Sequence, residues 1–148
     1  MKFIKILFIA LTFSLSVSTS SHSNQSVEEI IKGRKAIFSK NYQTAKKISI
    51  LLKSKKIEEA KPLMQEMSDN YKKLLNYFPE NTKEGFKTEA LPTIWENSDE
   101  FVTLMQKASF DMIQLTKTIN TAEDLRAIQK KLMWSNCSAC HNRFRAEH

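Results

Sequence analysis

Glycine and proline are so scarce in this chain that most β-rich folds are excluded at the outset. The 148 residues include two glycines and three prolines, and tight turns and β-hairpins depend on these two residue types. Apolar residues instead recur at intervals of three and four along most of the sequence, which is the spacing of one face of an α-helix. The sequence therefore predicts an all-α protein.

Four segments carry this helical spacing, with approximate bounds at residues 27–52, 57–78, 101–119 and 121–145. Ser26 and Glu29 have the spacing of a capping box at the start of the first segment. Ser98 or Asp99 is the expected cap of the third. Pro62 must lie in the first turn of the second helix or kink it. Four amphipathic helices of this length predict a four-helix bundle.

The connections between the segments agree with this architecture. Residues 54–56 and 120–121 are short links, which join antiparallel neighbours in a bundle. Residues 79–92 form one long link that contains Gly85. Two interpretations of the long link stay open, an ordered surface loop and a flap that borders a buried group.

The first residues of the chain have the pattern of a secretory signal peptide. Met1–Lys5 carries two lysines, residues 6–17 are apolar, and residues 16–21 are small. The apolar run is shorter than the roughly twenty residues that span a bilayer. We expect a signal peptide at residues 1–23, cleaved between Ser18 and Asn24, and one exported domain at residues 24–148 without a membrane span. An uncleaved membrane anchor is the alternative.

Cys137, Cys140 and His141 form the Cys-x-x-Cys-His motif of covalent haem attachment. In that chemistry the two thiols add to the vinyl groups of a haem, and the adjacent imidazole binds the iron. On the fourth helix these residues stand at positions i, i+3 and i+4, so they present both sulfurs and the imidazole on one face. We therefore expect one covalently bound haem c.

Three other interpretations of the cysteine pair stay open. A structural zinc site needs four ligands, but the chain has no further cysteine and its other histidines, His22 and His148, lie near opposite ends. A thioredoxin-like redox pair needs a preceding strand, whereas helix is expected before Cys137. A simple disulfide would leave His141 without a role.

Several short motifs accompany the attachment segment in a characteristic order. They are Arg34 with Phe38 four residues later, FPENT at 78–82, LPTIW at 91–95 with Phe101 after it, and Phe144-Arg145 just after His141. In order and spacing the chain resembles the class II c-type cytochromes, the cytochrome c′ family, over nearly all of the mature sequence. The resemblance implies an antiparallel four-helix bundle with covalently bound haem c. Trp134 departs from the pattern, because the family often has glycine shortly before the first cysteine.

The resemblance also implies roles for individual residues. In six-coordinate relatives a methionine four residues after the arginine binds the iron, and Phe38 stands at that position here. The implied iron is five-coordinate, with His141 as its axial ligand and an apolar distal pocket that excludes water and anions but admits nitric oxide or carbon monoxide. Arg34 belongs to the distal pocket, as a propionate partner or on the helix surface. Arg145 lies on the proximal side, where it tunes His141, meets a bound gas, or pairs with a propionate or solvent.

Other side chains in these helices have simpler expected roles. The alternative to a five-coordinate iron is a six-coordinate, low-spin electron carrier in which an unrecognised side chain is the sixth ligand. The methionines at 64, 67, 105 and 112 fall on core stripes, where a thioether normally fills space. Tyr42 is expected in the core between helices. Trp134 is expected to pack on a neighbouring helix or to shield the haem edge.

The charge of the chain bears on its partners. The formal net charge is +7, and removal of Lys2 and Lys5 with the signal peptide leaves +5. This sign suits an acidic redox protein partner, although the lysine clusters have the spacing of ordinary solvated helix faces. No nucleic-acid motif accompanies the charge.

Electron transfer and gas binding are the expected functions, and Phe38 favours gas binding. The chain has no acid or base at the expected distal position near Phe38, which speaks against an enzyme. Relatives often form homodimers, which is the expectation here too.

Overall fold

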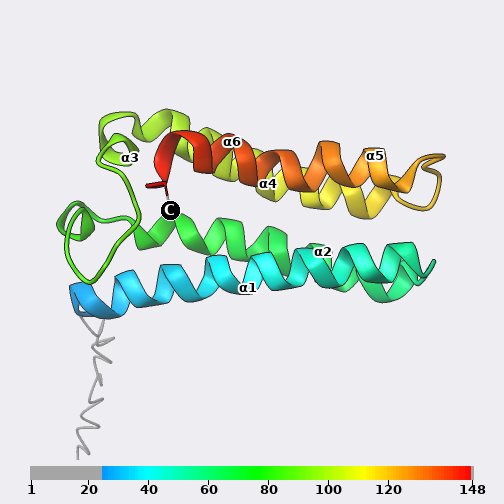
Figure 1. The fold of residues 1–148 in the computed structure, drawn as a ribbon, viewed down its shortest axis with the longest axis horizontal. Coiled ribbons are helices and arrows are strands. Elements are labelled where there is room, and N and C mark those ends of the chain that lie inside the picture. Colours follow the sequence, from blue (N-terminus) through cyan, green and yellow to red (C-terminus); the bar gives the residue numbers. More distant parts are fainter. Residues whose placement is uncertain (1–24, 148) are drawn as a thin grey trace, which may run out of the picture.

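The chain forms an antiparallel four-helix bundle in the computed structural model, which describes residues 25–147. The predicted signal peptide lies outside the described residues. Three long helices are α1 (Val27–Lys53), α2 (Ile57–Leu74) and α4 (Ser98–Thr118). The fourth is composite, with α5 (Leu125–Gln129), a π-helical segment (Lys130–Trp134) and α6 (Ser135–Phe144). Each of the four runs antiparallel to the one before it (Figure 1), so the predicted fold class is confirmed.

Helix α1 begins where the sequence predicts. Ser26 accepts a hydrogen bond from the backbone of Glu29, and the Glu29 carboxylate accepts one from the backbone of Ser26 at 2.7 Å. This is the predicted capping box. The buried face of the helix continues to its end at the residues 31, 34, 41, 44, 45, 48 and 52. Two polar residues, Arg34 and Asn41, are therefore part of the buried face of α1.

Helix α2 is shorter than predicted. It ends at Leu74 and continues as a 3-10 turn over Leu75–Tyr77, so the prediction of helix to Phe78 is wrong. Pro79 explains the difference, because a proline disfavours the helical conformation of the residue before it. Pro62 is the sixth residue of α2, beyond the first turn. Its missing amide leaves the Glu58 carbonyl without an i→i−4 partner.

The N-cap position of helix α4 lies one residue before the first of the two predicted cap residues. Ser98 is its first residue and Asn97 stands at the N-cap position without a side-chain cap bond, so neither Ser98 nor Asp99 is the cap. The Asn97 carbonyl accepts from the backbone of Phe101 at 3.1 Å. The single-turn helix α3 (Thr93–Glu96) comes directly before Asn97 and begins after Pro92, where the fixed backbone angle of proline favours a first turn.

The fourth helix differs from the sequence prediction in two ways. It begins at Leu125 and not near Thr121, because the Asp124 carboxylate caps it by accepting from the backbone of Arg126 and Ala127 at 2.9 and 3.0 Å. The link from α4 is correspondingly longer than predicted. Residues 130–134 form a wider π-helical turn, a local expansion that periodicity does not reveal. Helix α6, which carries Cys137, follows this turn directly.

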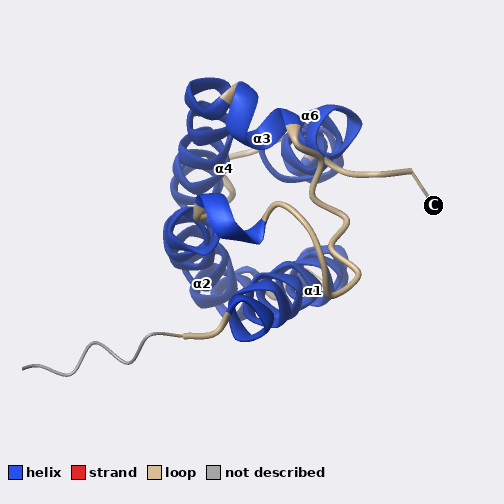
Figure 2. Ribbon diagram, turned by 90° about the vertical axis from the view of Figure 1, so that its left-hand side faces the viewer, coloured by secondary structure: helices blue, strands red, loops and turns tan. Residues whose placement is uncertain are grey.

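The core lies where the predicted stripes of α2 and α4 meet. The buried residues there include Ala60, Met64, Met67, Leu74, Met105, Ala108, Met112 and Leu115. The four internal methionines of these stripes are at most 2% exposed, which confirms their packing role. Viewed end-on, the four helices stand at the corners of the bundle and the link between α2 and α3 crosses one end (Figure 2). None of the helices within residues 25–147 is long and apolar enough to span a membrane.

Candidate haem site

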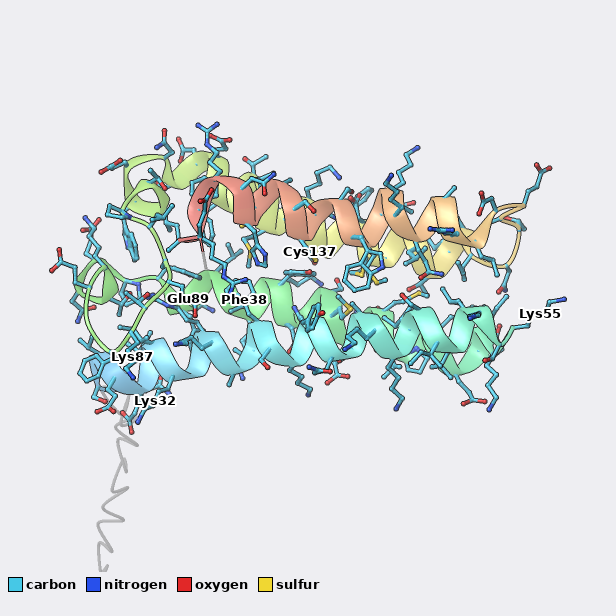
Figure 3. The ribbon with its side chains drawn as sticks, viewed as in Figure 1. Lys32, Phe38, Lys55, Lys87, Glu89 and Cys137 are labelled. Carbon is cyan, nitrogen blue, oxygen red and sulfur yellow. The ribbon has the colours of Figure 1, made fainter. Side chains whose placement is uncertain are left out.

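A cavity of about 660 Å³ opens between α1 and α6. Its volume lies within the roughly 300–1,000 Å³ range of ligand pockets. In Figure 3, Phe38 on α1 and Cys137 on the fourth helix lie in the space between the two layers of helices. The lining includes every residue that the sequence analysis assigned to the site, namely Arg34, Phe38, Cys137, Cys140, His141 and Arg145. The fold thus gathers residues from opposite ends of the chain into one pocket.

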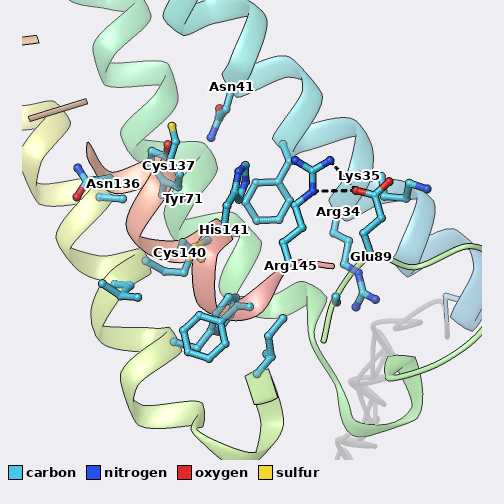
Figure 4. A pocket seen from close by; sticks show the side chains of 18 of the residues that line it. Arg34, Lys35, Asn41, Tyr71, Glu89, Asn136, Cys137, Cys140, His141 and Arg145 are labelled. Atoms are coloured by element: carbon cyan, nitrogen blue, oxygen red, sulfur yellow. Dashed lines mark hydrogen bonds and ion pairs between the residues drawn. The ribbon is translucent and has the colours of Figure 1, made fainter. Parts of the chain in front are cut away.

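Helix α6 presents the attachment motif on one wall of the cavity. Cys137 and Cys140 are free thiols, both half-buried, and His141 points into the cavity beside them (Figure 4). Burial raises the pKa of Cys140 to about 11, and burial also raises the pKa of Cys137. The Tyr71 phenol of α2 opposes the rise in the pKa of Cys137, and burial raises the pKa of Tyr71 itself. Both thiols are therefore protonated at neutral pH.

Phe38 lies on the α1 side of the cavity within a cluster of aromatic rings. Its centroid is 6.4 Å from that of Phe78, and Phe78 lies 4.7 Å from Phe101. The Trp95 indole nitrogen donates to the Phe78 carbonyl at 2.9 Å and fixes that end of the cluster. Edge-on ring pairs of this kind stabilise their geometry beyond simple burial. Phe38 thus has a defined place in the cavity wall.

Arg34 is a buried residue and not a helix-surface residue, so that reading of the sequence is wrong. The residue is 2% exposed. Its guanidinium donates to the Thr82 hydroxyl and carbonyl at 2.9 Å each, to Thr88 Oγ1 at 2.6 Å and to the Tyr77 carbonyl at 3.2 Å. The guanidinium carbon also lies 4.8 Å from the centroid of Phe78. Burial lowers the pKa of Arg34. Arg34 therefore binds the long link to α1 while it lines the cavity.

Residues 88–90 of the long link form part of the cavity lining. Glu89 accepts from Arg145 Nε at 2.9 Å and from Arg145 Nη2 at 2.8 Å, an ion pair drawn in Figure 4. The backbones meet at the same point, where Ala90 and Arg145 form an isolated antiparallel bridge. Of the two open interpretations of this link, the structure supports the flap that borders a buried site. The pairing of Arg145 with Glu89 was not predicted from the sequence.

Tyr42 and Trp134 close one side of the same cavity. Their rings are edge-on with centroids 6.3 Å apart, so they join α1 to the π-helical segment. Tyr42 is 54% exposed, and the expectation that it belongs to the core is wrong. Trp134 packs on a neighbouring helix, as expected, and also lines the cavity. The two readings of Trp134 are therefore compatible.

The cavity is less apolar than the resemblance implies. Asn41 of α1 lines it and is 3% exposed. Sequence analysis overlooked this residue, although it interrupts the apolar stripe three residues after Phe38. Asn136 of α6 also lines the cavity, and its amide donates to Asp111 Oδ2 at 3.0 Å and to the Leu132 carbonyl at 3.0 Å. The lining is thus largely apolar but includes two polar amides that were not predicted from the sequence.

The lining has the chemistry that a covalent haem requires. Two thiols and an imidazole share one wall, aromatic rings face them, and the cations Arg34, Lys35 and Arg145 lie in the lining near the long link, where propionates would find partners. The residues before Cys137 are helical, which contradicts the thioredoxin-like reading. The cavity and its donors therefore fit a haem bound through Cys137 and Cys140, with His141 as the iron ligand.

Comparisons with known proteins agree with this fit. The family model described as Cytochrome C′ matches residues 29–145. A cytochrome c′ of Rhodopseudomonas palustris is 33% identical over 122 residues, which are 80% of this chain and 83% of that protein. The solved cytochrome c′ structure from Rhodopseudomonas palustris is 28% identical, with a TM-score of 0.64 over 83% of this chain and 98% of that one. The one from Thermochromatium tepidum has a TM-score of 0.70 over 84% of this chain and 100% of that one; at 19% identity it supports the fold alone.

Family, fold and site residues thus point to the same cofactor. The attachment motif lies inside the matched region and lines the cavity. The chain belongs to the cytochrome c′ family, and its cofactor is a covalently bound haem c.

Proposed function

We propose that this protein is an exported c-type cytochrome whose haem iron is five-coordinate, bound by His141 and open on the side of α1. Phe38 carries this proposal, because the position expected for a sixth ligand holds a phenyl ring packed at 6.4 Å from Phe78. A phenyl ring has no lone pair for a metal. When bound, haem supplies a one-electron redox couple and a coordination position for a small ligand.

Binding of nitric oxide or carbon monoxide is the function that this arrangement supports best. Both gases are neutral and small, so an aromatic wall admits them at little desolvation cost. Electron transfer is the second role. We expect it to be slower than in a six-coordinate carrier, because an open iron changes its spin and ligation on reduction. In the described part of α1 that lines the cavity there is no histidine or carboxylate for acid–base catalysis. We therefore propose a binding protein or carrier and not an enzyme.

A six-coordinate, low-spin electron carrier is the alternative function. Met105 of α4 favours it, because this methionine lines the cavity and a thioether can bind haem iron. Met105 is also 2% exposed in the core, which favours a packing role. The two functions differ in whether the iron has a free coordination position.

The proposed location is the periplasm, reached through a cleaved signal peptide at residues 1–23. The charge pattern of those residues and the family membership support export. The proposed partners are an acidic redox protein, for which the net positive charge is suited, and a diatomic gas. A homodimer is a further expectation from the family.

An absorption spectrum of the purified ferrous protein, with and without carbon monoxide, tests the proposed function. Broad high-spin bands that change on addition of the gas are expected. A sharp low-spin α-band that is indifferent to gas would establish the six-coordinate alternative. Mass spectrometry of the exported protein should show haem attached to Cys137 and Cys140, and bare thiols would overturn the proposal.

Phe38→Met provides the matched variant for this test. Because the thioether would stand where six-coordinate relatives have their ligand, the ferrous spectrum should become low-spin and insensitive to carbon monoxide. Ile37→Met places the same side chain on the neighbouring residue of α1, which packs against the core and is absent from the cavity lining, and it should leave the high-spin spectrum in place. An unchanged Phe38→Met spectrum would contradict the proposed position of Phe38 over the iron.

A further inference from the structure

One polar group of the cavity has no partner within the chain. Of the buried side-chain nitrogen and oxygen atoms in residues 25–147, Asn41 Nδ2 makes no hydrogen bond. Leaving a buried amide donor without a partner costs about 1–3 kcal/mol, so an orphaned donor inside a ligand cavity indicates that the ligand supplies the acceptor. Buried Arg34, on the same wall, has donors that are engaged in four hydrogen bonds.

The orientation of this amide is fixed by a neighbouring helix. Asn70 Nδ2 of α2 donates to Asn41 Oδ1 at 2.8 Å. That bond holds the oxygen of Asn41 toward α2 and leaves the nitrogen directed at the cavity. Figure 4 shows the Asn41 side chain reaching from α1 toward the space in front of His141 and Cys137. The donor is therefore held in place before any ligand arrives, which reduces the entropic cost of its use.

The position of Asn41 along α1 identifies which part of a bound haem it faces. Asn41 stands three residues after Phe38 and seven after Arg34, about 10 Å along the helix from the latter. Figure 4 shows Asn41 and Cys137 on one side of His141 and the Arg145–Glu89 pair on the other. Haem propionates would be held at the end with the cations. Asn41, one helical turn after Phe38 on α1, therefore lies away from the propionate end.

We propose that Asn41 donates a hydrogen bond to a ligand bound on the α1 side of the haem iron, and so selects small ligands whose outer atom is negatively polarised or anionic. This inference rests on the proposed open coordination position and adds a polar contact to it. Cyanide and nitrite belong to this class of ligand, and carbon monoxide is its weakest acceptor. The α1 side of the site then discriminates between ligands and does not simply exclude anions.

Two measurements on the holoprotein test the proposal with Asn41→Leu, which keeps the branched shape of the side chain and removes the donor. Cyanide affinity of the ferric protein should fall roughly ten- to a hundredfold, as expected for a lost hydrogen bond to a charged acceptor. The C–O stretching frequency of the ferrous carbon monoxide complex should rise, because a donor near the oxygen lowers it. Thr44→Val is the matched control, since Thr44 is a buried polar residue of α1 that is absent from the cavity lining. It should change neither quantity.

A second pair of variants keeps the test decisive if Asn41→Leu is unstable. Asn41→Leu with Asn70→Leu removes both partners of the amide pair, a change that is often nearly neutral for stability, and should give the same two shifts. Asn41→Asp places an anion where the Asn41 amide stands and should weaken cyanide binding more than Asn41→Leu does.

Unchanged cyanide affinity and an unchanged C–O frequency in Asn41→Leu would overturn the inference. So would a variant in which only the reduction potential shifts, since that would assign the amide to a propionate. Failure of the proposed function has a different signature, because a ferrous spectrum that does not respond to carbon monoxide would show that no coordination position is open.

Discussion

At the scale of single residues, Arg34 shows how a charged side chain is used inside this bundle. A buried guanidinium is stable only when its donors are satisfied, and here four hydrogen bonds reach three residues of the link between α2 and α3. The same group lies over the Phe78 ring at 4.8 Å. Arg34 therefore couples the position of the flap to the aromatic wall of the haem site.

Replacement of Arg34 by methionine should destabilise the protein and loosen the flap. We expect the free energy of unfolding to fall by about 2–4 kcal/mol, because buried acceptors lose charged donors. Urea unfolding measures this loss, and hydrogen exchange should be faster in residues 79–92. Lys35→Met is the control, since exposed Lys35 bonds the same flap through the Lys87 carbonyl at 2.9 Å and should cost less than about 0.5 kcal/mol. Equal losses in the two variants would contradict this role of Arg34.

Gly33 is a second residue whose role depends on a distant contact. A β-carbon at this position would lie 2.6 Å from Cε1 of Tyr77. Alanine normally stabilises a helix interior by about 1 kcal/mol relative to glycine, but here the contact opposes that gain. Gly33→Ala should therefore lower the thermal midpoint of unfolding. In a Tyr77→Ala background the same substitution should raise it, and a loss in both backgrounds would show that Tyr77 is not the cause.

At the scale of elements, the N-terminus of α1 depends on a charged cap. The backbone amide of Ser26 donates to the Glu29 carboxylate, which lowers the pKa of Glu29. A carboxyl group whose pKa is lower in the folded state stabilises the fold above its unfolded pKa and loses that contribution as the pH falls through the folded value. The cap should thus act at neutral pH and weaken below about pH 4.

Comparison of Glu29→Ala with the unchanged protein tests this dependence. At pH 7 the variant should unfold at a lower temperature, and the difference should shrink as the pH falls below about 4. Glu28→Ala removes the same charge from the same turn and leaves the Ser26 contact, so it measures the general helix-dipole effect together with the exposed ion pair between Glu28 and Lys32. A Glu29→Ala difference that is constant with pH would contradict the charged cap.

The fourth helix shows what element-level reasoning could not predict. Its apolar spacing identified a helix that carries Cys137, but the π-helical turn at residues 130–134 and the later start at Leu125 were not visible in the pattern. A periodic stripe averages over several turns, so one wider turn hardly changes it. The π-helical turn directly follows α5, which Asp124 caps, and directly precedes α6. The haem-attachment segment on α6 is therefore preceded directly by an irregular helical turn.

At the scale of the whole molecule, haem is expected to be part of the hydrophobic core. A cavity of about 660 Å³ between α1 and α6 leaves these helices with few direct contacts unless a cofactor fills it. Aromatic side chains that line the cavity, such as Phe38 and Trp134, would then face water. The fold of the haem-free chain should be poorly packed.

A Cys137→Ala and Cys140→Ala double variant, which cannot attach haem, tests this expectation. It should lose most of the roughly 5–15 kcal/mol that stabilises a typical domain, keep its far-ultraviolet helical signal, lose its near-ultraviolet signal and bind a hydrophobic dye. Cys137→Ala alone retains one thioether and should remain close to the unchanged protein. A double variant with native packing would show that the four helices specify the core without haem.

The fold and the attachment chemistry follow from local features of the sequence. Apolar spacing sets which face of each helix is buried, and the motif at 137–141 is complete within five residues. Such features act within one or two turns, so a linear reading captures them. The same reading identified Phe38 and Arg145 through the family pattern, and the structure places both in the lining of one cavity with Cys137.

Only the tertiary structure decided what the polar residues of the site contact. Arg34 bonds Thr82 and Thr88, which lie 48 and 54 residues away, and Arg145 meets Glu89 across 56 residues. In Asn41 the side-chain oxygen accepts a hydrogen bond from Asn70 on another helix, while the side-chain nitrogen has no partner. Burial makes every buried donor and acceptor depend on a partner, and the choice of partner is made by which helices and loops meet in space. The amino-acid order alone therefore determined the helices and the haem-binding motif, while packing determined the chemistry around it.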